Sequence, residues 1–180
     1  RRGRSRRCRS SSASSSTRRG SSNSSSGIYA REGSTVIDNV SRDNTQYGIY
    51  AYNYSTVTGN TVKGNDMSGL WLEVGVTATG NTVGSNNEAD LMVAGTYRDA
   101  GIRVGWGSIV KGNTLYSNTR HNIFVWGYDN AIEENLVTLS TYGIYFDGTG
   151  NFYANNRASG NTTNYGSTAG NTDGGGNASF

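Results

Sequence analysis

The 180-residue chain contains no proline, one cysteine and one histidine. The single cysteine, Cys8, excludes a disulfide within the chain and a metal cluster built from several thiolates. No apolar stretch approaches the roughly 20 residues that a membrane-spanning helix needs. The composition therefore predicts no disulfide framework, no thiolate-bound metal and no membrane span, and nothing in it indicates a cofactor.

The basic residues are distributed unevenly. Residues 1–26 hold eight of the 16 Lys and Arg residues and no acid, so the rest of the chain carries eight basic and 13 acidic residues, a net charge of −5. The pI of about 9.1 thus reflects the N-terminal segment. Because the rest of the chain is acidic, nucleic acid is not expected as a partner apart from this basic tail. The tail itself has no aromatic residues on which bases could stack, which weakens that interpretation of it.

A sequence unit with a fixed period repeats through most of the chain. Gly27, Gly48 and Gly69 follow one another at a period of 21, as do Gly101, Asn122 and Gly143, and an aliphatic residue follows each of them. A fixed period of this length is typical of a solenoid.

Within each unit, apolar residues follow a strand pattern. The first five residues alternate between inward apolar residues, such as Ile49 and Ala51, and polar or aromatic ones, which predicts a strand with one buried face. Two shorter apolar runs follow, separated by Gly or Asn. The inward slot of the second run is assigned to Val36, Val57, Ala78, Val110, Ala131 and Phe152. Three strands per unit, each stacked on its equivalent in the next, predict an all-β parallel β-helix of about six coils.

Asparagine recurs at one phase of the unit, at Asn39, Asn60, Asn81, Asn113 and Asn155. Equal side chains stacked about 4.8 Å apart can form a hydrogen-bonded ladder along the rod. The register slips by one position around Glu134 and Asn135, which predicts a bulge there.

These repeats resemble the right-handed parallel β-helix repeat family, of the bacterial Asn/Gly-rich type. The resemblance rests on Gly48-Ile49, on the Ser-x-Val-x-Gly-Asn pattern of residues 55–60 and on Val62, which recur from Gly101 to Leu115. Relatives of this shape include polysaccharide lyases, epimerases and hydrolases, so the resemblance implies the fold and leaves the activity open.

One segment departs from the period. Asp90 should open a coil, and Leu91 and Val93 fit its inward positions, yet the next unit begins too early, at Gly101. Residues 95–100 are therefore expected to protrude as a loop or a shortened half-turn. Such departures are either tolerated surface insertions or places where function resides.

The outward positions of the first strand are unusually aromatic. Aromatic rings at coil spacing make an apolar strip on which sugar rings can lie, with charged neighbours for the hydroxyls; alternatively, aromatics simply suit strands and stack on each other. The predicted substrate-binding residues are Tyr29, Tyr50, Tyr52, Trp71, Glu73, Tyr97, Arg98, Asp99, Phe124 and Trp126.

A catalytic set is a weaker hypothesis. In a uronate lyase or epimerase an Arg neutralises the carboxylate, a base removes the α-proton and an acid completes the reaction. Arg103 or Arg120 fits the first role, His121 the second, and Tyr145 or Tyr97 the third, with Asp147 nearby. The Asp-Pro-His-Asp motif of alginate epimerases and the motif set of polygalacturonases are missing.

The sequence thus predicts a disordered Arg/Ser-rich tail (1–26), a parallel β-helix (27–165) and a frayed C-terminal end (166–180). The tail is interpreted as the start of a fragment or a misread gene start, as a linker, or as an arm for an anionic partner. The favoured function is polysaccharide binding or adhesion at an extracellular or cell-surface location. The alternatives are a lyase, an epimerase or a fragment of one, and a purely structural spacer.

Overall fold

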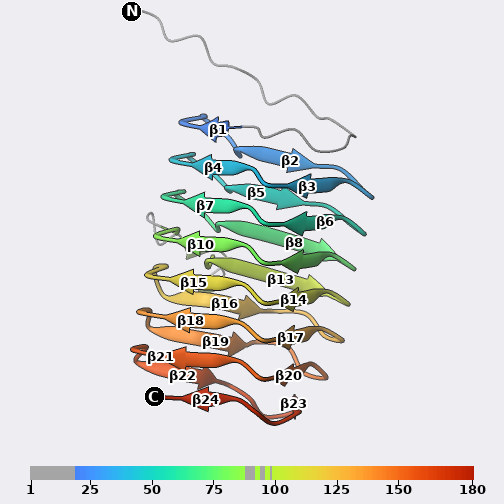
Figure 1. Ribbon diagram of the computed structural model, residues 1–180, viewed down its shortest axis with the longest axis vertical. Coiled ribbons are helices and arrows are strands. Elements are labelled where there is room, and N and C mark those ends of the chain that lie inside the picture. Colours follow the sequence, from blue (N-terminus) through green and yellow to red (C-terminus); the bar gives the residue numbers. More distant parts are fainter. Residues whose placement is uncertain (1–18, 88–91, 94–95, 98) are drawn as a thin grey trace, which may run out of the picture.

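The computed structural model describes residues 19–87, 92–93, 96–97 and 99–180, and these residues form a parallel β-helix (Figure 1). Each turn contributes one strand to each of three parallel sheets. The first sheet contains β2 (Ile28–Ala30), β5 (Ile49–Ala51), β8 (Leu70–Val74), β13 (Ile102–Trp106), β16 (His121–Val125), β19 (Tyr142–Phe146) and β22 (Thr163–Gly166).

The second and third sheets complete each turn. The second contains β3 (Thr35–Ile37), β6 (Thr56–Thr58), β9 (Thr77–Thr79), β14 (Ile109–Lys111), β17 (Ala131–Glu133), β20 (Phe152–Ala154) and β23 (Thr172–Asp173). The third contains β1 (Arg19–Ser21), β4 (Val40–Arg42), β7 (Thr61–Lys63), β10 (Thr82–Gly84), β15 (Thr114–Tyr116), β18 (Leu136–Thr138), β21 (Arg157–Ser159) and β24 (Ala178–Ser179).

The predicted fold is confirmed by the stacking of equivalent inward residues. Ile49 pairs with Leu70, Leu70 with Ile102, Ile102 with Ile123 and Ile123 with Ile144, and all five side chains are fully buried. Because each turn repeats the same apolar positions, the interior is one continuous cluster of mostly aliphatic side chains, which Phe146 and Tyr153 join in the later coils.

Asparagine ladders pair the hydrogen-bonding groups at the corners between the sheets. In the ladder that runs from Asn39 to Asn177, each Asn donates its backbone N–H and its Nδ2 to Oδ1 of the next, as Asn60 does to Asn81 at 2.9 and 3.0 Å. Nδ2 also donates to a strand carbonyl, for example from Asn81 to Val57 at 2.9 Å. The members of this ladder are Asn39, Asn60, Asn81, Asn113, Asn135, Asn156 and Asn177.

Two further ladders occupy the other corners. One links Asn23, Asn44, Asn65, Asn86 and Asn118, and the other links Ser108, Asn130, Asn151 and Asn171. All three corners of the β-helix thus carry buried side-chain amides whose donors and acceptors are paired.

The register slip lies earlier than the sequence suggested. Val104 pairs with Val125 in the first sheet, and Val110 pairs with Ile132 in the second. The sequence separation between the paired residues is one residue larger in the second sheet than in the first. The extra residue therefore lies in the corner between β16 and β17. As a result Ile132 and Tyr153 point into the core, and the predicted inward residues Ala131 and Phe152 do not. The same shift places Asn156, in place of Asn155, in the ladder.

The insertion is also larger than predicted. β8 pairs directly with β13, so no coil begins at Asp90. Val93, predicted to fit an inward position of the first sheet, instead belongs to β11 (Met92–Val93), which pairs antiparallel with β12 (Thr96–Tyr97) outside the three sheets. Leu91 lies outside the described residues.

The C-terminal end continues the β-helix instead of fraying. β23 pairs with β20 and β24 with β21, and Asn171 and Asn177 extend two ladders. The phenol of Tyr165, packed against the core, donates to the carbonyl of Asn156 at 2.9 Å and contacts that of Ala178 at 3.1 Å. The first sheet accordingly has seven strands, one turn more than predicted. At the other end β1 lies inside the predicted tail, and residues 1–18 lie outside the described part.

Candidate functional site

The outward face of the first sheet presents three columns of side chains. Two of them follow from the alternation of successive residues along a strand, and the third consists of residues that directly precede the repeat units and lie against the central rings. The central column follows the register of the strands, whereas the flanking columns lie at the start and end of each strand. The central column is Tyr29, Tyr50, Trp71, Arg103, Phe124 and Tyr145. The flanking columns include Tyr47, Ser68, His121 and Tyr142 on one side and Arg31, Tyr52, Glu73, Trp126 and Asp147 on the other.

The first three coils of this face form an aromatic platform, defined as Tyr29, Tyr47, Tyr50, Tyr52 and Trp71. The rings of Tyr29 and Tyr50 stack at 4.9 Å with an interplanar angle of 6°. Trp71 meets Tyr50 edge-on at 5.0 Å and Tyr47 at 4.6 Å. Tyr29 is 42% exposed and Tyr52 39%, and the other three rings are half-buried, so solvent reaches the platform mainly at Tyr29 and Tyr52. Such a rigid group of rings offers a large contact area at little cost in side-chain entropy.

Charged groups are held against these rings. The Tyr50 hydroxyl donates a hydrogen bond of 2.6 Å to Glu73 Oε1, and burial together with this bond raises the pKa of Tyr50. The guanidinium carbon of Arg103 lies 4.1 Å from the centroid of the Trp71 ring and 5.3 Å from that of Trp126. These distances are those of cation–π contacts, which orient the guanidinium between the two indoles.

Asp99 is buried next to the platform. Its Oδ1 accepts a hydrogen bond of 2.7 Å from the Ser68 hydroxyl, and only 2% of the residue is exposed. Burial, and after it the Asp99 carboxylate, raises the pKa of Tyr47 to about 12, with a smaller raising effect of Glu73 and a lowering effect of Arg103. Tyr47 therefore stays a neutral hydrogen-bonding group at all physiological pH values.

A second aromatic group surrounds His121 in the later coils. The imidazole stacks on Tyr142 at 5.2 Å and lies 5.1 Å from Phe124 and 5.4 Å from Tyr145, measured between ring centroids. Phe124 and Tyr145 stack on each other at 6.0 Å. His121 is 4% exposed and Phe124 1%, so these two side chains are buried, whereas Tyr142 and Tyr145 are half-buried.

The structure brings some of the predicted residues together and separates others. His121 and Tyr145 are in contact, and Arg103 lies one coil before His121. Arg120 occupies the turn before β16 with φ at 70°, and Asp147 is exposed in the far flanking column. Arg103, at 7% exposure, interrupts the strip that the sequence predicts to be exposed throughout. The side chain of Tyr97 and the whole of Arg98 lie outside the described residues.

Tyr47 and Tyr142 are not among the residues predicted from the sequence, although each directly precedes the first residue of its unit, as His121 does. Extending each unit by one position towards the N-terminus identifies them. Trp106, whose ring lies 4.0 Å from that of Trp126 at the end of the strand, was not predicted either. Among the described residues, no group of three or more His, Cys, Asp or Glu side chains gathers to hold a metal ion.

A hydrophobic helix that could cross a bilayer is not found in the part of the chain that the structure describes. The search of curated protein sequences gives no match.

Solved structures of similar shape include epimerases of alginate. The periplasmic alginate epimerase AlgG superposes with a TM-score of 0.68 at 17% identity, over 90% of this chain and 44% of that one. A double mutant of AlgG gives a TM-score of 0.63 at 16% identity, over 90% of this chain and 43% of that one. The A-module of the Azotobacter vinelandii mannuronan C-5 epimerase AlgE6 gives 0.58 at 14%, over 90% of this chain and 56% of that one.

The chain thus spans less than half the length of the AlgG epimerase that it resembles. At these identities the likeness is one of fold. A family model described as the right handed beta helix region matches residues 9–180, which is nearly the whole chain, and the chain belongs to this family.

Proposed function

We propose that this protein binds polysaccharide on the outward face of its first sheet, through the aromatic platform of the first three coils. The observation that carries the proposal is the group of contacting rings formed by Tyr29, Tyr50 and Trp71. Tyr29 stacks on Tyr50 and is exposed, Trp71 meets Tyr50 edge-on, and Glu73 accepts a hydrogen bond from Tyr50 at the side of the group. Sugar rings have apolar faces that pack on aromatic rings, while their hydroxyls need fixed polar partners. The carbohydrate-related fold neighbours support the same ligand class.

Binding is favoured over catalysis because of where solvent reaches this face. The platform is accessible, whereas the predicted base His121 and the predicted carboxylate partner Arg103 are 4% and 7% exposed. A general base has to come within hydrogen-bonding reach of the proton that it removes. In this arrangement a polysaccharide lying on the platform would contact Tyr50 and Trp71 without reaching the imidazole.

Calorimetric titration with alginate, pectin and glucuronan tests the proposal. Trp71→Ala removes the platform ring of the third coil, which contacts Tyr47 and Tyr50, and is expected to weaken binding by about tenfold or more. Phe180→Ala is the matched control, because Phe180 is an exposed aromatic at the far end of the chain. A purely structural spacer would bind none of the three polymers, and equal affinities of the two variants would show that the platform is not the site.

A second candidate, a uronate lyase or epimerase, is favoured by the contact between His121 and Tyr145 and by the epimerase fold neighbours. A lyase leaves an unsaturated uronate that absorbs in the ultraviolet, and an epimerase changes the ratio of mannuronate to guluronate signals in the NMR spectrum of alginate. Turnover that is lost in His121→Ala would establish the enzyme. Binding without turnover would support the non-catalytic binding function.

We infer an extracellular, cell-surface or periplasmic location from the same argument, because polysaccharides of this kind lie outside the cytoplasm. The periplasmic AlgG epimerase among the fold neighbours agrees with it. Fractionation of cells that express the natural gene would test it.

A further inference from the structure

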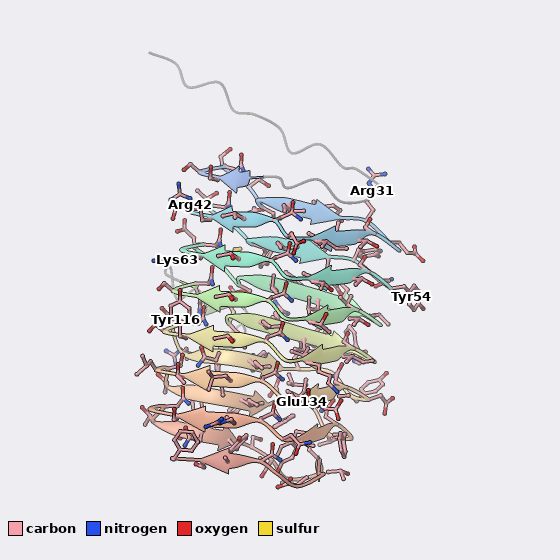
Figure 2. All side chains as sticks on the ribbon, viewed as in Figure 1. Arg31, Arg42, Tyr54, Lys63, Tyr116 and Glu134 are labelled. Carbon is pink, nitrogen blue, oxygen red and sulfur yellow. The ribbon has the colours of Figure 1, made fainter. Side chains whose placement is uncertain are left out.

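The corner between the first and second sheets carries a second group of aromatic residues that the platform does not include. We define the corner cluster as Tyr54, Trp106 and Tyr128. Tyr54 is 65% exposed and Tyr128 57%, and Trp106 lies 6.3 Å from Tyr128 between ring centroids. Figure 2 shows Tyr54 projecting from the side of the β-helix.

Tyr54 occupies a backbone conformation that its residue type disfavours. Its φ is 56°, and it directly precedes Ser55, the residue that is equivalent in this coil to the ladder residue Ser108. The equivalent positions in the other coils hold Gly33, Gly75, Gly107, Asp129, Gly150 and Gly170, all with φ between 58° and 77°. Bulky residues at positive φ are uncommon, and such strain concentrates at functional sites. The chain thus keeps an aromatic residue where glycine would fit better.

The surroundings of Tyr54 leave room for a ligand. Its ring lies over Gly75, where a Cβ atom would come within 2.8 Å of Cδ1, so glycine is required there for the ring to lie flat. One coil further, a Cβ atom at Gly107 would meet nothing within 4 Å. Backbone hydrogen bonds from Tyr54 to Val74, from Gly75 to Trp106 and from Gly107 to Tyr128 fix these coils in order. Tyr54 and Tyr128 therefore stand about 14 Å apart along the axis, at about 4.8 Å per coil, with glycine backbone between them.

The charge of the corner distinguishes it from the platform. Glu32 and Asp129 are exposed in this corner, and Asp147 is exposed at its edge. The corner segments 31–33, 53–54, 74–75, 105–107, 126–129 and 147–150 carry three carboxylates and a single guanidinium, that of Arg31. Carboxylates repel an anionic chain and accept hydrogen bonds from the hydroxyls of an uncharged one.

We propose that the corner cluster is a binding site for a neutral polysaccharide, separate from the platform. The surface has two exposed rings three coils apart, with glycine backbone between them and carboxylates that can accept hydrogen bonds. Such a surface suits an extended chain of uncharged hexoses. This site does not depend on the proposed function, because none of its residues belongs to the platform.

Calorimetry with cellohexaose, mannohexaose and a mannuronate hexasaccharide tests the proposal. At least one neutral hexasaccharide is expected to bind the wild-type protein, and Tyr128→Ala and Tyr54→Asn are each expected to weaken that binding by about tenfold. Asn tolerates positive φ, so Tyr54→Asn is expected to leave the thermal unfolding midpoint unchanged or raise it. Phe180→Ala serves as the control for loss of an exposed ring.

Two results would overturn the proposal. One is the absence of neutral hexasaccharide binding at millimolar concentration, or binding that both corner variants retain in full. The other is a lower unfolding midpoint for Tyr54→Asn with unchanged affinity, which would make Tyr54 a cover for Gly75 only. Trp71→Ala keeps the two proposals apart, because it is expected to leave neutral hexasaccharide binding unchanged and to weaken the binding of acidic polymers.

Discussion

The guanidinium of Arg103 lies 4.1 Å from the centre of the Trp71 ring, one coil away in the first sheet. A double-mutant cycle with Trp71→Phe and Arg103→Met measures how much this contact contributes to the free energy of unfolding. Met retains an apolar side chain but lacks the charge, and Phe retains a smaller ring. The expected coupling in the free energy of unfolding is about 0.5–2 kcal/mol. Additive effects of the two substitutions would mean that the residues are merely neighbours.

The Asn39–Asn177 ladder predicts a sharp contrast between two adjacent residues. Asn156→Ala removes the Nδ2 donor to Asn177 Oδ1 and to the Ile132 carbonyl, and it removes the Oδ1 that accepts from the backbone N–H and from Nδ2 of Asn135. The expected loss in the free energy of unfolding is about 2–4 kcal/mol.

Asn155→Gly is the matched control for that substitution. Asn155 is exposed and has a φ of 56°, which glycine adopts without strain. Urea unfolding should show a change of less than about 1 kcal/mol. Equal losses at the two positions would contradict the assignment of Asn156 to the ladder.

Close coil stacking makes Gly69 irreplaceable. A Cβ atom there would lie 2.7 Å from Val83 Cγ1 and 2.8 Å from the carbonyl oxygen of Gly101. Gly69→Ala is expected to destabilise the fold by about 2–4 kcal/mol, because the carbonyl belongs to the backbone of the next coil and cannot yield. Thermal unfolding measures the effect, and a midpoint within one degree or so of the wild type would show that the coils can separate there.

Alkaline pH should weaken the fold through Tyr47. The pKa of Tyr47 is raised from 10.0 to about 12, so the folded state holds this proton more tightly than the unfolded state does. The resulting stability is complete below pH 10 and is lost as the pH rises towards 12. Urea midpoints measured between pH 9 and 11.5 should fall less steeply in Tyr47→Phe than in the wild type. Parallel curves would rule out a contribution from Tyr47.

The period of 21 made the architecture predictable from the sequence. Inward residues such as Ile49, Leu70 and Ile123 return at one phase, and this regularity follows from one circuit of the backbone per unit. The ladder could be anticipated for the same reason, because four of its members keep that spacing or differ from it only by the insertion.

The predictions of inward residues were wrong where the 21-residue repeat gains a residue inside a corner. The extra residue between Val125 and Ala131 shifts every later position of the second sheet, so Ile132 replaces Ala131 in the core. Apolar residues stand at both positions, and a pattern of apolar residues alone cannot choose between them. The hairpin of β11 and β12 was missed because Met92 and Val93 alternate like a strand of the first sheet, although the sheet continues from β8 to β13 without them.

The candidate site was only partly predictable. The central column follows from alternation within the strands, but the burial of Arg103 and His121 depends on how the face is packed. The platform gained Tyr47 because its ring meets Trp71 across one coil, a contact between residues at different phases of the repeat.

Fluorescence from Trp71 alone tests the polysaccharide site most directly. Trp71 is one of three tryptophans, so Trp106→Phe combined with Trp126→Phe leaves it as the single reporter. Titration with a mannuronate hexasaccharide is expected to shift and intensify its emission in a saturable way, with the midpoint that calorimetry gives for the same variant. Emission that stays constant while calorimetry records binding would show that the ligand lies elsewhere, and the absence of both signals would refute polysaccharide binding on this face.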